Sequence, residues 1–474
     1  MRENVGKVKR KRVKKTQMNK KRSAFSGKIG YVLSAAGASV GLGNIWRFPY
    51  LAAKYGGGIF LLVYIILALT FGYTMIVAES ALGRMTRKSP VGAFRSFTKG
   101  KKVGWLSFGG WINAIIPVLI VPYYSVIGGW VVKYLFEYIR GNGSKLAEDG
   151  YFSGFISNGG ATEICFVIFC MFTLVIIYAG VQNGIERVSK IMMPILIILS
   201  VIIAIYSVTR PGAIEGVKYF LVPNVKNFSW MTVVAAMGQM FYSLSIAMGI
   251  LVTFGSYMRK DTSIEDSTRN VEIFDTAIAM MAGLMIIPAV FAFSGGDPDT
   301  LQAGPSLMFI TIPKVFANMG FGTAVGILFF VLVLFAAVTS SIALTESAVS
   351  TFEDELGWGR KKATILTGVI MIALGTLSCL GYGPLDFVKI IGMQFLDFFD
   401  FLTNSVMMPI AALMTSLLVS RVIGVDKIEE EIRHGESAFR RKKIFVVMIK
   451  YLCPIFALII LASSVANAFG WIAM

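Results

Sequence analysis

Long apolar runs, separated by short polar stretches, account for most of the chain. Eleven of these runs reach the roughly 20 residues that a helix needs to cross a bilayer. They are predicted at about 28–53, 58–83, 104–139, 163–181, 189–209, 229–257, 271–293, 320–353, 363–381, 388–420 and 444–471. The pattern therefore predicts an all-α polytopic membrane protein with eleven transmembrane helices.

The first apolar run carries flexible and polar residues in its middle. Gly37, Gly41 and Gly43 lie there together with Asn44, and Arg47 follows. A glycine inside a helix costs roughly 1 kcal/mol relative to alanine, so the backbone is expected to open near the middle of the membrane. In hydrocarbon an open backbone is tolerated only where it is buried in protein or lines a cavity. The sequence therefore predicts a broken helix that holds a polar ligand.

A second polar interruption lies five spans later, at 239–249, where hydroxyls, an amide and a glycine interrupt the sixth run. Polar breaks at corresponding positions of two five-span halves are typical of transporters built from inverted repeats, with the binding site at the midplane. We predict a first repeat over 23–210 and a second over 211–425. A cytoplasmic loop and an extra helix follow over 426–474.

Composition and charge agree with a membrane protein. The 474 residues are 55% hydrophobic and only 15% charged, which leaves too little polar surface for a soluble protein of this size. The net charge of +18 arises from the N-terminal segment and from the loops after every second span, which is the positive-inside pattern. This pattern argues against nucleic acid as a partner. The charge pattern also predicts a protein of the cell inner membrane whose N-terminus lies in the cytoplasm and whose C-terminus lies outside.

Residues 1–22 are expected to form a disordered basic arm that contacts anionic membrane lipid. The polar stretches around 141–160 and 295–318 are long and rich in Gly, Ser, Asn and Pro. They are expected to be loops, which either cap a vestibule or merely cover the surface.

Little in the chain resembles an enzyme. The single histidine, His434, lies in a charged loop, and no metal-ligand cluster, nucleophile elbow or phosphate loop is present. The four cysteines form no C-x-x-C pair and are expected to be structural. We expect no catalysis and no cofactor.

Seven motifs occur in a fixed order: the run 41–50 (GLGNIWRFPY), 56–58 (GGG), Glu79 with Gly83 and Arg84, Tyr123 with Tyr124, Gly238 with Gln239, 339–341 (TSS) and 352–356 (FEDEL). In this order they resemble the neurotransmitter:sodium symporter family, in particular its bacterial amino-acid transporters. The resemblance implies the leucine-transporter fold, a 5+5 inverted repeat in which helices 1 and 6 are broken.

The resemblance implies two sodium sites. The first would use the Ser39 carbonyl, the Asn44 side chain, Ser243 and Asp275, and the second the carbonyls of Gly37, Val40 and Ala336 with the hydroxyls of Thr339 and Ser340. Oxygen ligands of these kinds suit a hard cation, although hydroxyls such as those at 339–341 also serve helix–helix hydrogen bonding. Asp275 replaces an amide of the leucine transporter. As a buried carboxylate it needs a cation or a proton, so we expect it to supply the charge that chloride supplies in animal relatives.

The resemblance also implies the substrate pocket, which would be formed by Ala38, Ser39, Leu42, Gly43, Ile120, Tyr124, Tyr242, Ser243, Ser245, Met248, Ser340 and Leu344. The half-helix N-terminus and the Tyr124 hydroxyl suit a carboxylate, and half-helix C-terminal carbonyls suit an ammonium. Monoamine carriers of the family have an aspartate at the position of Gly41, so its absence favours an amino acid. Met248, where the leucine transporter has phenylalanine, either makes room for a large side chain or simply fills the core.

The same resemblance implies an outer gate and an inner gate on the two sides of the pocket. On the outer side of the pocket, Arg47 would pair with Asp400, or with Asp397 one turn earlier. The alternative is that the Arg47 side chain simply extends to the membrane surface and has no partner. Tyr242 would lie over the substrate as a lid.

On the inner side, Arg22 would pair with Asp354, with Phe25, Ser26 and Tyr257 nearby. Glu79 is expected to hydrogen-bond the broken backbone.

The function implied is sodium-coupled import of a neutral amino acid, with a large aliphatic or aromatic side chain, by alternating access and without chloride. Two sodium ions are expected as co-substrates. A channel or sensor that does not concentrate its ligand, and a proton-coupled carrier that uses Asp275, are the alternatives. The oligomeric state is left open by the sequence.

Overall fold

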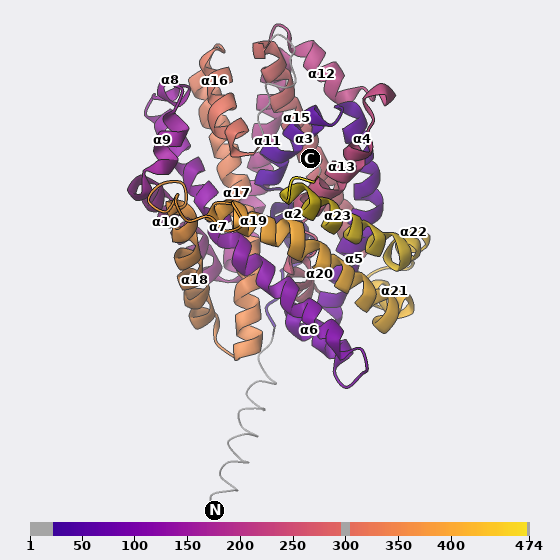
Figure 1. The fold of residues 1–474 in the computed structure, drawn as a ribbon. Helices are drawn as coiled ribbons and strands as arrows, with labels where there is room; N and C mark the ends of the chain where they lie inside the picture. The colour runs from indigo at the N-terminus through magenta and orange to yellow at the C-terminus, as the bar shows by residue number, and fades with distance from the viewer. Residues whose placement is uncertain (1–21, 295–303, 472–474) are drawn as a thin grey trace, which may run out of the picture.

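The computed structural model describes residues 22–294 and 304–471. These residues form one helical bundle (Figure 1). The start of the described chain lies at the same end of the bundle as α6 (Pro90–Thr98), whereas α8 (Gly143–Leu146), α12 (Ala213–Leu221) and α16 (Ile312–Ala317) lie at the opposite end. We call these two ends the N-terminal side and the opposite side. The predicted arm falls almost entirely outside the described residues, and only Arg22 of it is seen.

The first half of the chain supplies five spans. Their segments are α2 (Lys28–Ser39), η1 (Gly43–Arg47), α3 (Phe48–Lys54), α4 (Gly58–Leu67), η2 (Ala68–Gly72), α5 (Tyr73–Thr86), η3 (Gly104–Leu106), α7 (Ser107–Ile139), α10 (Gly159–Ala179), η4 (Val181–Glu186) and α11 (Arg187–Val208). The short connecting helices are α6 (Pro90–Thr98), α8 (Gly143–Leu146), α9 (Tyr151–Ser157), α12 (Ala213–Leu221) and η5 (Val225–Asn227).

The second half repeats the pattern and adds one span. Its segments are α13 (Trp230–Ser243), α14 (Ile250–Tyr257), α15 (Ile264–Ser294), η7 (Leu307–Thr311), α16 (Ile312–Ala317), α17 (Gly322–Leu356), α18 (Arg360–Leu380), α19 (Phe395–Asp400), η8 (Phe401–Met407), α20 (Met408–Leu417), η9 (Leu418–Ile423), α21 (Val425–Arg433), α22 (Lys442–Val447), η10 (Met448–Leu452) and α23 (Cys453–Ala468).

All eleven predicted spans are present in the described part of the chain. Nine are continuous apolar helices long enough to cross a membrane. The other two are the predicted broken helices, whose halves are α2 with η1–α3 and α13 with α14. The all-α membrane architecture is thus confirmed, while the exact repeat boundaries stay a prediction.

Several boundaries differ from those predicted because polar residues take part in helices. The seventh span begins at Ile264 instead of near 271, because Glu265 and Glu272 of its first turns are bound rather than solvated. Glu265 accepts hydrogen bonds from the Tyr73 hydroxyl and from the backbone N–H of Arg441, and the Arg441 side chain pairs with Glu272 at 3.3 Å. A hydropathy pattern cannot show that a charged helical turn has partners elsewhere in the chain.

The two long polar stretches were predicted to be loops, and this is wrong for much of their length. Residues 141–160 contain α8 and α9, and η7 and α16 occupy 307–317. Their apolar side chains form an aromatic cluster with α7, in which Phe152 stacks on Phe309 and Tyr134 donates a 2.8 Å hydrogen bond to the Phe309 carbonyl. Residues 295–303 of the second stretch lie outside the described residues.

The backbone opens at both predicted breaks. In the first break, residues 40–41 lie between α2 and the next helical turn. The second break is longer and covers 244–249, where Ser245 and Ala247 have positive φ angles of 53° and 60°. Such angles are rare for residues with a side chain and are associated with functional sites. Gly249, also at positive φ, has no room for a Cβ, which would come 2.5 Å from the Asn113 carbonyl oxygen.

Glu79 of α5 holds the second break in place, as expected from the sequence. Its carboxylate is completely buried and accepts a 2.8 Å hydrogen bond from the backbone N–H of Ala247. Because Ala247 lies in the unwound segment, its N–H has no helical partner to bind. Glu79 therefore replaces the missing turn of helix.

Candidate functional site

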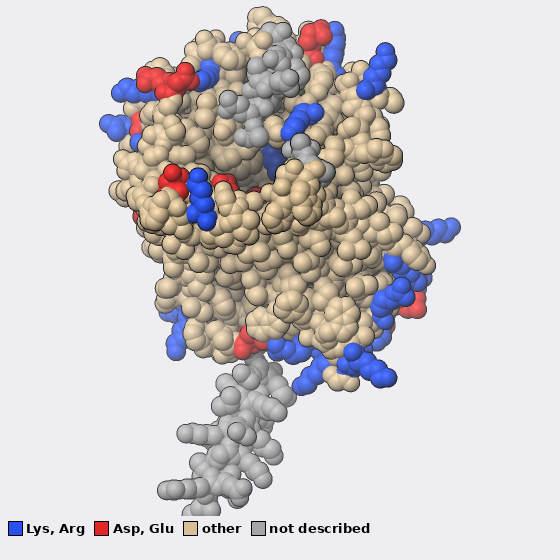
Figure 2. Space-filling view, viewed as in Figure 1, with Lys and Arg blue, Asp and Glu red and all other residues tan. Residues whose placement is uncertain are grey.

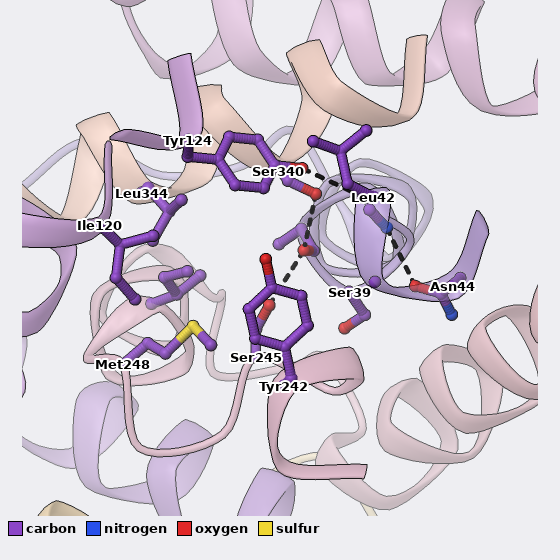
Figure 3. Close-up of a pocket in the computed structure, with 14 residues that line it drawn as sticks. Ser39, Leu42, Asn44, Ile120, Tyr124, Tyr242, Ser245, Met248, Ser340 and Leu344 are labelled. Carbon is purple, nitrogen blue, oxygen red and sulfur yellow. Dashed lines mark hydrogen bonds between the residues drawn. The ribbon is translucent and has the colours of Figure 1, made fainter. Parts of the chain in front are cut away.

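A pocket lies between the two breaks (Figure 3). It is lined by Ala38, Ser39, Gly41, Leu42, Gly43, Asn44, Ile120, Tyr124, Tyr242, Ser245, Met248, Ile250, Ser340 and Leu344. These include eleven of the twelve residues predicted to bind substrate. The twelfth, Ser243, lies behind the pocket wall in the cluster around Asp275.

Sequence reasoning missed Ile250 as a pocket residue. It is the first residue of the half-helix α14, directly after the break. The sequence could have indicated Ile250 by its position directly after Gly249, because the first residue of the second half-helix lies beside the same cavity as the break.

The pocket has a polar side and an apolar side. Tyr124 accepts a 3.3 Å hydrogen bond from the backbone N–H of Leu42, and Ser245 donates a 2.9 Å hydrogen bond to the Ala38 carbonyl. In Figure 3 the side chains of Ile120, Met248 and Leu344 gather away from these groups. A ligand with a polar head and an apolar tail matches this division.

Two glycines set the size of the polar side. A Cβ at Gly41 would lie 2.6 Å from the Ser340 hydroxyl oxygen and 3.2 Å from the Tyr124 hydroxyl oxygen. A Cβ at Gly43 would overlap the ring of Tyr242. Both positions therefore require glycine in this conformation, and the backbone lies open toward the pocket.

The residues predicted for the second ion site come together at the first break. The Ser340 hydroxyl lies 3.4, 3.2 and 3.3 Å from the carbonyl oxygens of Gly37, Ala38 and Val40. A hydroxyl donates only one hydrogen bond, so three carbonyls around one hydroxyl leave acceptor capacity of the kind that a hard cation can use. Thr339 lies beside Gly37, with its hydroxyl 3.2 Å from the Ala336 carbonyl oxygen.

The residues predicted for the first ion site surround Asp275. Its Oδ1 accepts hydrogen bonds from the Asn44 amide at 2.8 Å and the Ser243 hydroxyl at 2.7 Å, and its Oδ2 accepts one from Tyr64 at 2.7 Å. Asp275 is completely buried, and no basic side chain pairs with it among the described residues. A buried carboxylate that only neutral groups contact calls for a bound cation or a proton. Ser39, the remaining member, lines the adjacent pocket.

On the opposite side, a vestibule of about 410 Å³ leads toward the pocket. Arg47, Asp397 and Asp400 all line it. In Figure 2 a hollow with basic and acidic side chains inside it is visible on the face shown. Residues of α23, including Ser463 and Ser464, complete the wall, and this contribution of the last span was not predicted.

The predicted pair between Arg47 and Asp400, or between Arg47 and Asp397, is not formed in this conformation. Arg47 instead lies 5.4 Å from the ring centre of Tyr242. Asp400 is bound by the Asn404 amide at 2.6 Å, while Tyr382 binds Asp397. Neutral donors thus bind both carboxylates, and Arg47 does not bridge the vestibule. Tyr242 lines both cavities and separates the vestibule from the pocket.

The N-terminal side is closed as predicted. Arg22 pairs with Asp354 at 2.6 Å and lies 4.9 Å from the ring centre of Tyr257. Burial lowers the pKa of the Arg22 guanidinium, but the neighbouring acidic groups produce a net rise, which keeps it charged. Arg22 also donates to the Ser256 and Ser350 hydroxyls, two contacts that the sequence did not reveal.

Phe25 packs in the same closure, and its N–H donates a 3.1 Å hydrogen bond to the Tyr257 carbonyl. Ser26, expected nearby, follows Phe25 directly, and its backbone N–H donates a 2.9 Å hydrogen bond to the carboxylate of Glu186. Ser26 thereby ties the N-terminal segment to η4, a contact that the sequence did not reveal.

Replacing Arg22 by glutamine is expected to open this closure in a larger share of molecules. The change removes an ion pair whose two side chains are only 16% and 25% exposed. Its loss is expected to shift the equilibrium between closed and open molecules roughly tenfold. The measurement is the labelling rate of a cysteine introduced at Ser350, next to the pair. A rate equal to that of the protein with intact Arg22 would contradict the assignment of Arg22 to the closure.

The described residues contain no group of three or more His, Cys, Asp or Glu side chains that could hold a metal ion. The polar groups at and beside the pocket are hydroxyls, backbone carbonyls, one amide and one carboxylate.

Comparisons with known proteins agree with this site. The sequence profile of the sodium:neurotransmitter symporter family matches residues 22–144 and 151–470. An uncharacterized sodium-dependent transporter of Bacillus subtilis is 36% identical, over 87% of this chain and 91% of the relative. Another, of Haemophilus influenzae, is 32% identical, over 95% of this chain and 99% of the relative.

Among solved structures, the crystal structure of MhsT in complex with L-phenylalanine is similar, with a TM-score of 0.84 and 36% identity. The similarity covers 94% of this chain and 100% of MhsT. Family, relatives and fold are those of transporters and not of enzymes. The chain therefore belongs to the sodium:neurotransmitter symporter family, as a multi-pass, sodium-dependent membrane transporter.

Proposed function

We propose that this protein imports a neutral amino acid with a large aliphatic or aromatic side chain, coupled to two sodium ions and independent of chloride. The observation that carries this proposal is the character of the pocket: no charged side chain lines it, and its polar groups belong to the two breaks and their hydroxyl partners. A zwitterion brings its own two charges, which the broken helix ends suit.

The apolar side of the pocket supports a large side chain on the substrate. Ile120, Met248, Ile250 and Leu344 surround this space, and none of them offers a hydrogen bond. The flexible thioether of Met248 adapts its shape to a planar or branched group. The related MhsT was crystallised with L-phenylalanine, which is a substrate of the proposed kind.

Replacing Met248 by phenylalanine is expected to reduce uptake of aromatic amino acids roughly tenfold relative to alanine or valine, because a rigid ring fills the apolar side of the pocket. The measurement is the ratio of initial uptake rates for labelled phenylalanine and valine. Isoleucine at the same position keeps the volume and serves as the control. An unchanged ratio in the phenylalanine variant would show that Met248 only fills the core.

Asp275 supports sodium coupling without chloride. A sodium ion held by Asn44, Ser243 and the Ser39 carbonyl next to this carboxylate has a negative charge within its own site. The anion is then part of the protein, and no chloride is required. A relative from human, the sodium- and chloride-dependent GABA transporter 2, is 26% identical over 87% of this chain.

The conformation supports alternating access. The N-terminal side is closed by Arg22 and Asp354, while the vestibule on the opposite side is open as far as Tyr242. If the N-terminal side is cytoplasmic, as the positive-inside pattern favours, this is a state closed to the cytoplasm. Import then requires pairing of Arg47 across the vestibule, followed by release of the Arg22 pair.

Competition in proteoliposomes tests the substrate and the anion. Twenty amino acids are offered in excess against labelled phenylalanine, with chloride or gluconate as the anion. We expect competition by large neutral amino acids only, and equal rates in both anions. Competition by charged amino acids would contradict the proposed substrate class, and loss of uptake in gluconate would contradict chloride independence.

A further inference from the structure

A cavity on the N-terminal side is separate from the substrate pocket and shares only Asp354 with the closure made by Arg22. It lies between α6 and the end of α17, has a volume of about 390 Å³, and is lined by Lys88, Gly92, Arg95, Ser96, Lys99, Asp354 and Glu355. In Figure 2 basic side chains gather along the lower edge of the molecule, where Figure 1 shows α6.

The charge in this cavity is not balanced. Asp354 is bound by Arg22 and by the N–H of Ser89, and Arg95 pairs with Glu355 at 2.8 Å. Both carboxylates are thus satisfied.

The two lysines of the cavity have no carboxylate partner within the described part of the chain. Lys88 donates only to the Ser96 hydroxyl, at 3.0 Å. The Lys99 ammonium is exposed at the cavity edge. The cavity therefore carries excess positive charge, which includes a guanidinium, and ammonium and guanidinium groups are the donors that bind phosphate.

The cavity lies beside the ends of two candidate membrane spans. Lys88 follows the span that ends at Thr86, and Lys99 precedes the span that begins at Gly104. On the first turns of that second span, Trp105 and Phe108 are each 60% exposed. Exposed aromatic residues next to basic ones mark the membrane–water interface.

From these observations we propose that the cavity between α6 and α17 is a binding site for a phosphate group, supplied by the headgroup of an anionic lipid. Lys88 and Lys99 supply the charge, and Arg95 donates hydrogen bonds from the guanidinium N–H groups that Glu355 does not occupy. The bound phosphate lies beside Asp354, so it adjoins the closure made by Arg22. The site is independent of which amino acid is transported.

Two arms distinguish lipid phosphate from free phosphate. In one, the full chain is reconstituted in phosphatidylcholine vesicles containing phosphatidylglycerol and extracted in mild detergent, and native mass spectrometry counts the phosphatidylglycerol retained. In the other, protein from pure phosphatidylcholine is equilibrated with labelled inorganic phosphate. Each arm compares the unmodified protein with K88Q/K99Q and with K101Q/K102Q, which removes equal charge from the same loop outside the cavity.

We expect phosphatidylglycerol to be retained by the unmodified protein and by K101Q/K102Q, and retention to fall roughly tenfold in K88Q/K99Q. The same pattern with inorganic phosphate alone would keep the phosphate site but overturn lipid as its source. Equal losses in both double variants, or no binding in either arm, would overturn the site itself. Equal melting temperatures of the three proteins exclude unfolding as the cause of a loss.

Discussion

Replacing Asp275 by alanine is expected to lower the initial rate of sodium-driven uptake by roughly 100-fold, because truncating one member of a buried, hydrogen-bonded charge pair costs about 2–5 kcal/mol. The carboxylate is completely buried and is held by Asn44, Ser243 and Tyr64. Without it, a sodium ion at this place has no compensating charge. The measurement is uptake of labelled substrate as a function of sodium concentration.

The asparagine variant of Asp275 separates charge from shape. It keeps the size of the side chain and removes the negative charge, so sodium affinity should fall. Because Tyr64 and Ser243 would still present hydroxyl groups there, chloride added at high concentration is expected to restore part of the uptake. Full activity of the asparagine variant in gluconate would contradict a role for the charge, whereas Tyr64→Phe, which keeps the carboxylate, is expected to have the smaller effect.

Replacing Arg84 by leucine is expected to destabilise the protein by about 3–5 kcal/mol, because it leaves the buried carboxylate of Glu431 without its partner. Arg84 is completely buried, pairs with Glu431 at 2.6 Å and donates a 2.6 Å hydrogen bond to the Thr262 carbonyl. It thereby joins α5 to the connection between α14 and α15 and to α21. The measurement is the thermal unfolding of the purified protein in detergent.

An exposed ion pair on the same side provides the matched control for Arg84. Arg433 is 58% exposed and pairs with Glu429 at 2.9 Å, so its replacement by glutamine is expected to change stability by less than about 1 kcal/mol. If Arg84→Leu shifted the melting temperature no more than Arg433→Gln does, the buried pair would not be a main link between these elements.

The two breaks could be predicted because their signal is local. Glycines that occur together with an amide and hydroxyls in the middle of an apolar run favour an opened backbone over a straight membrane helix. The family resemblance then assigned positions, and the structure brings nearly all of them to one pocket. Glu79, expected to bind the broken backbone, does so at Ala247.

The contacts that could not be predicted depend on partners far apart in the chain. Arg47 is one example. It lines the vestibule together with Asp397 and Asp400, and whether it pairs with either carboxylate depends on the conformation of the protein and not on the identity of these residues. Ser26 is another, because its partner Glu186 lies 160 positions further along the chain, in η4. The helices within the predicted loops 141–160 and 295–318 are a third example, because they are held by aromatic contacts with α7, such as that of Phe309 with Tyr134, which are not a local feature.

The most direct test of sodium-coupled amino-acid import is uptake of labelled phenylalanine into proteoliposomes under one imposed gradient at a time. The account predicts accumulation above the external concentration when sodium is higher outside, and none when only a proton or a chloride gradient is imposed. Accumulation driven by protons in the absence of sodium, or equilibration without accumulation under the sodium gradient, would contradict it.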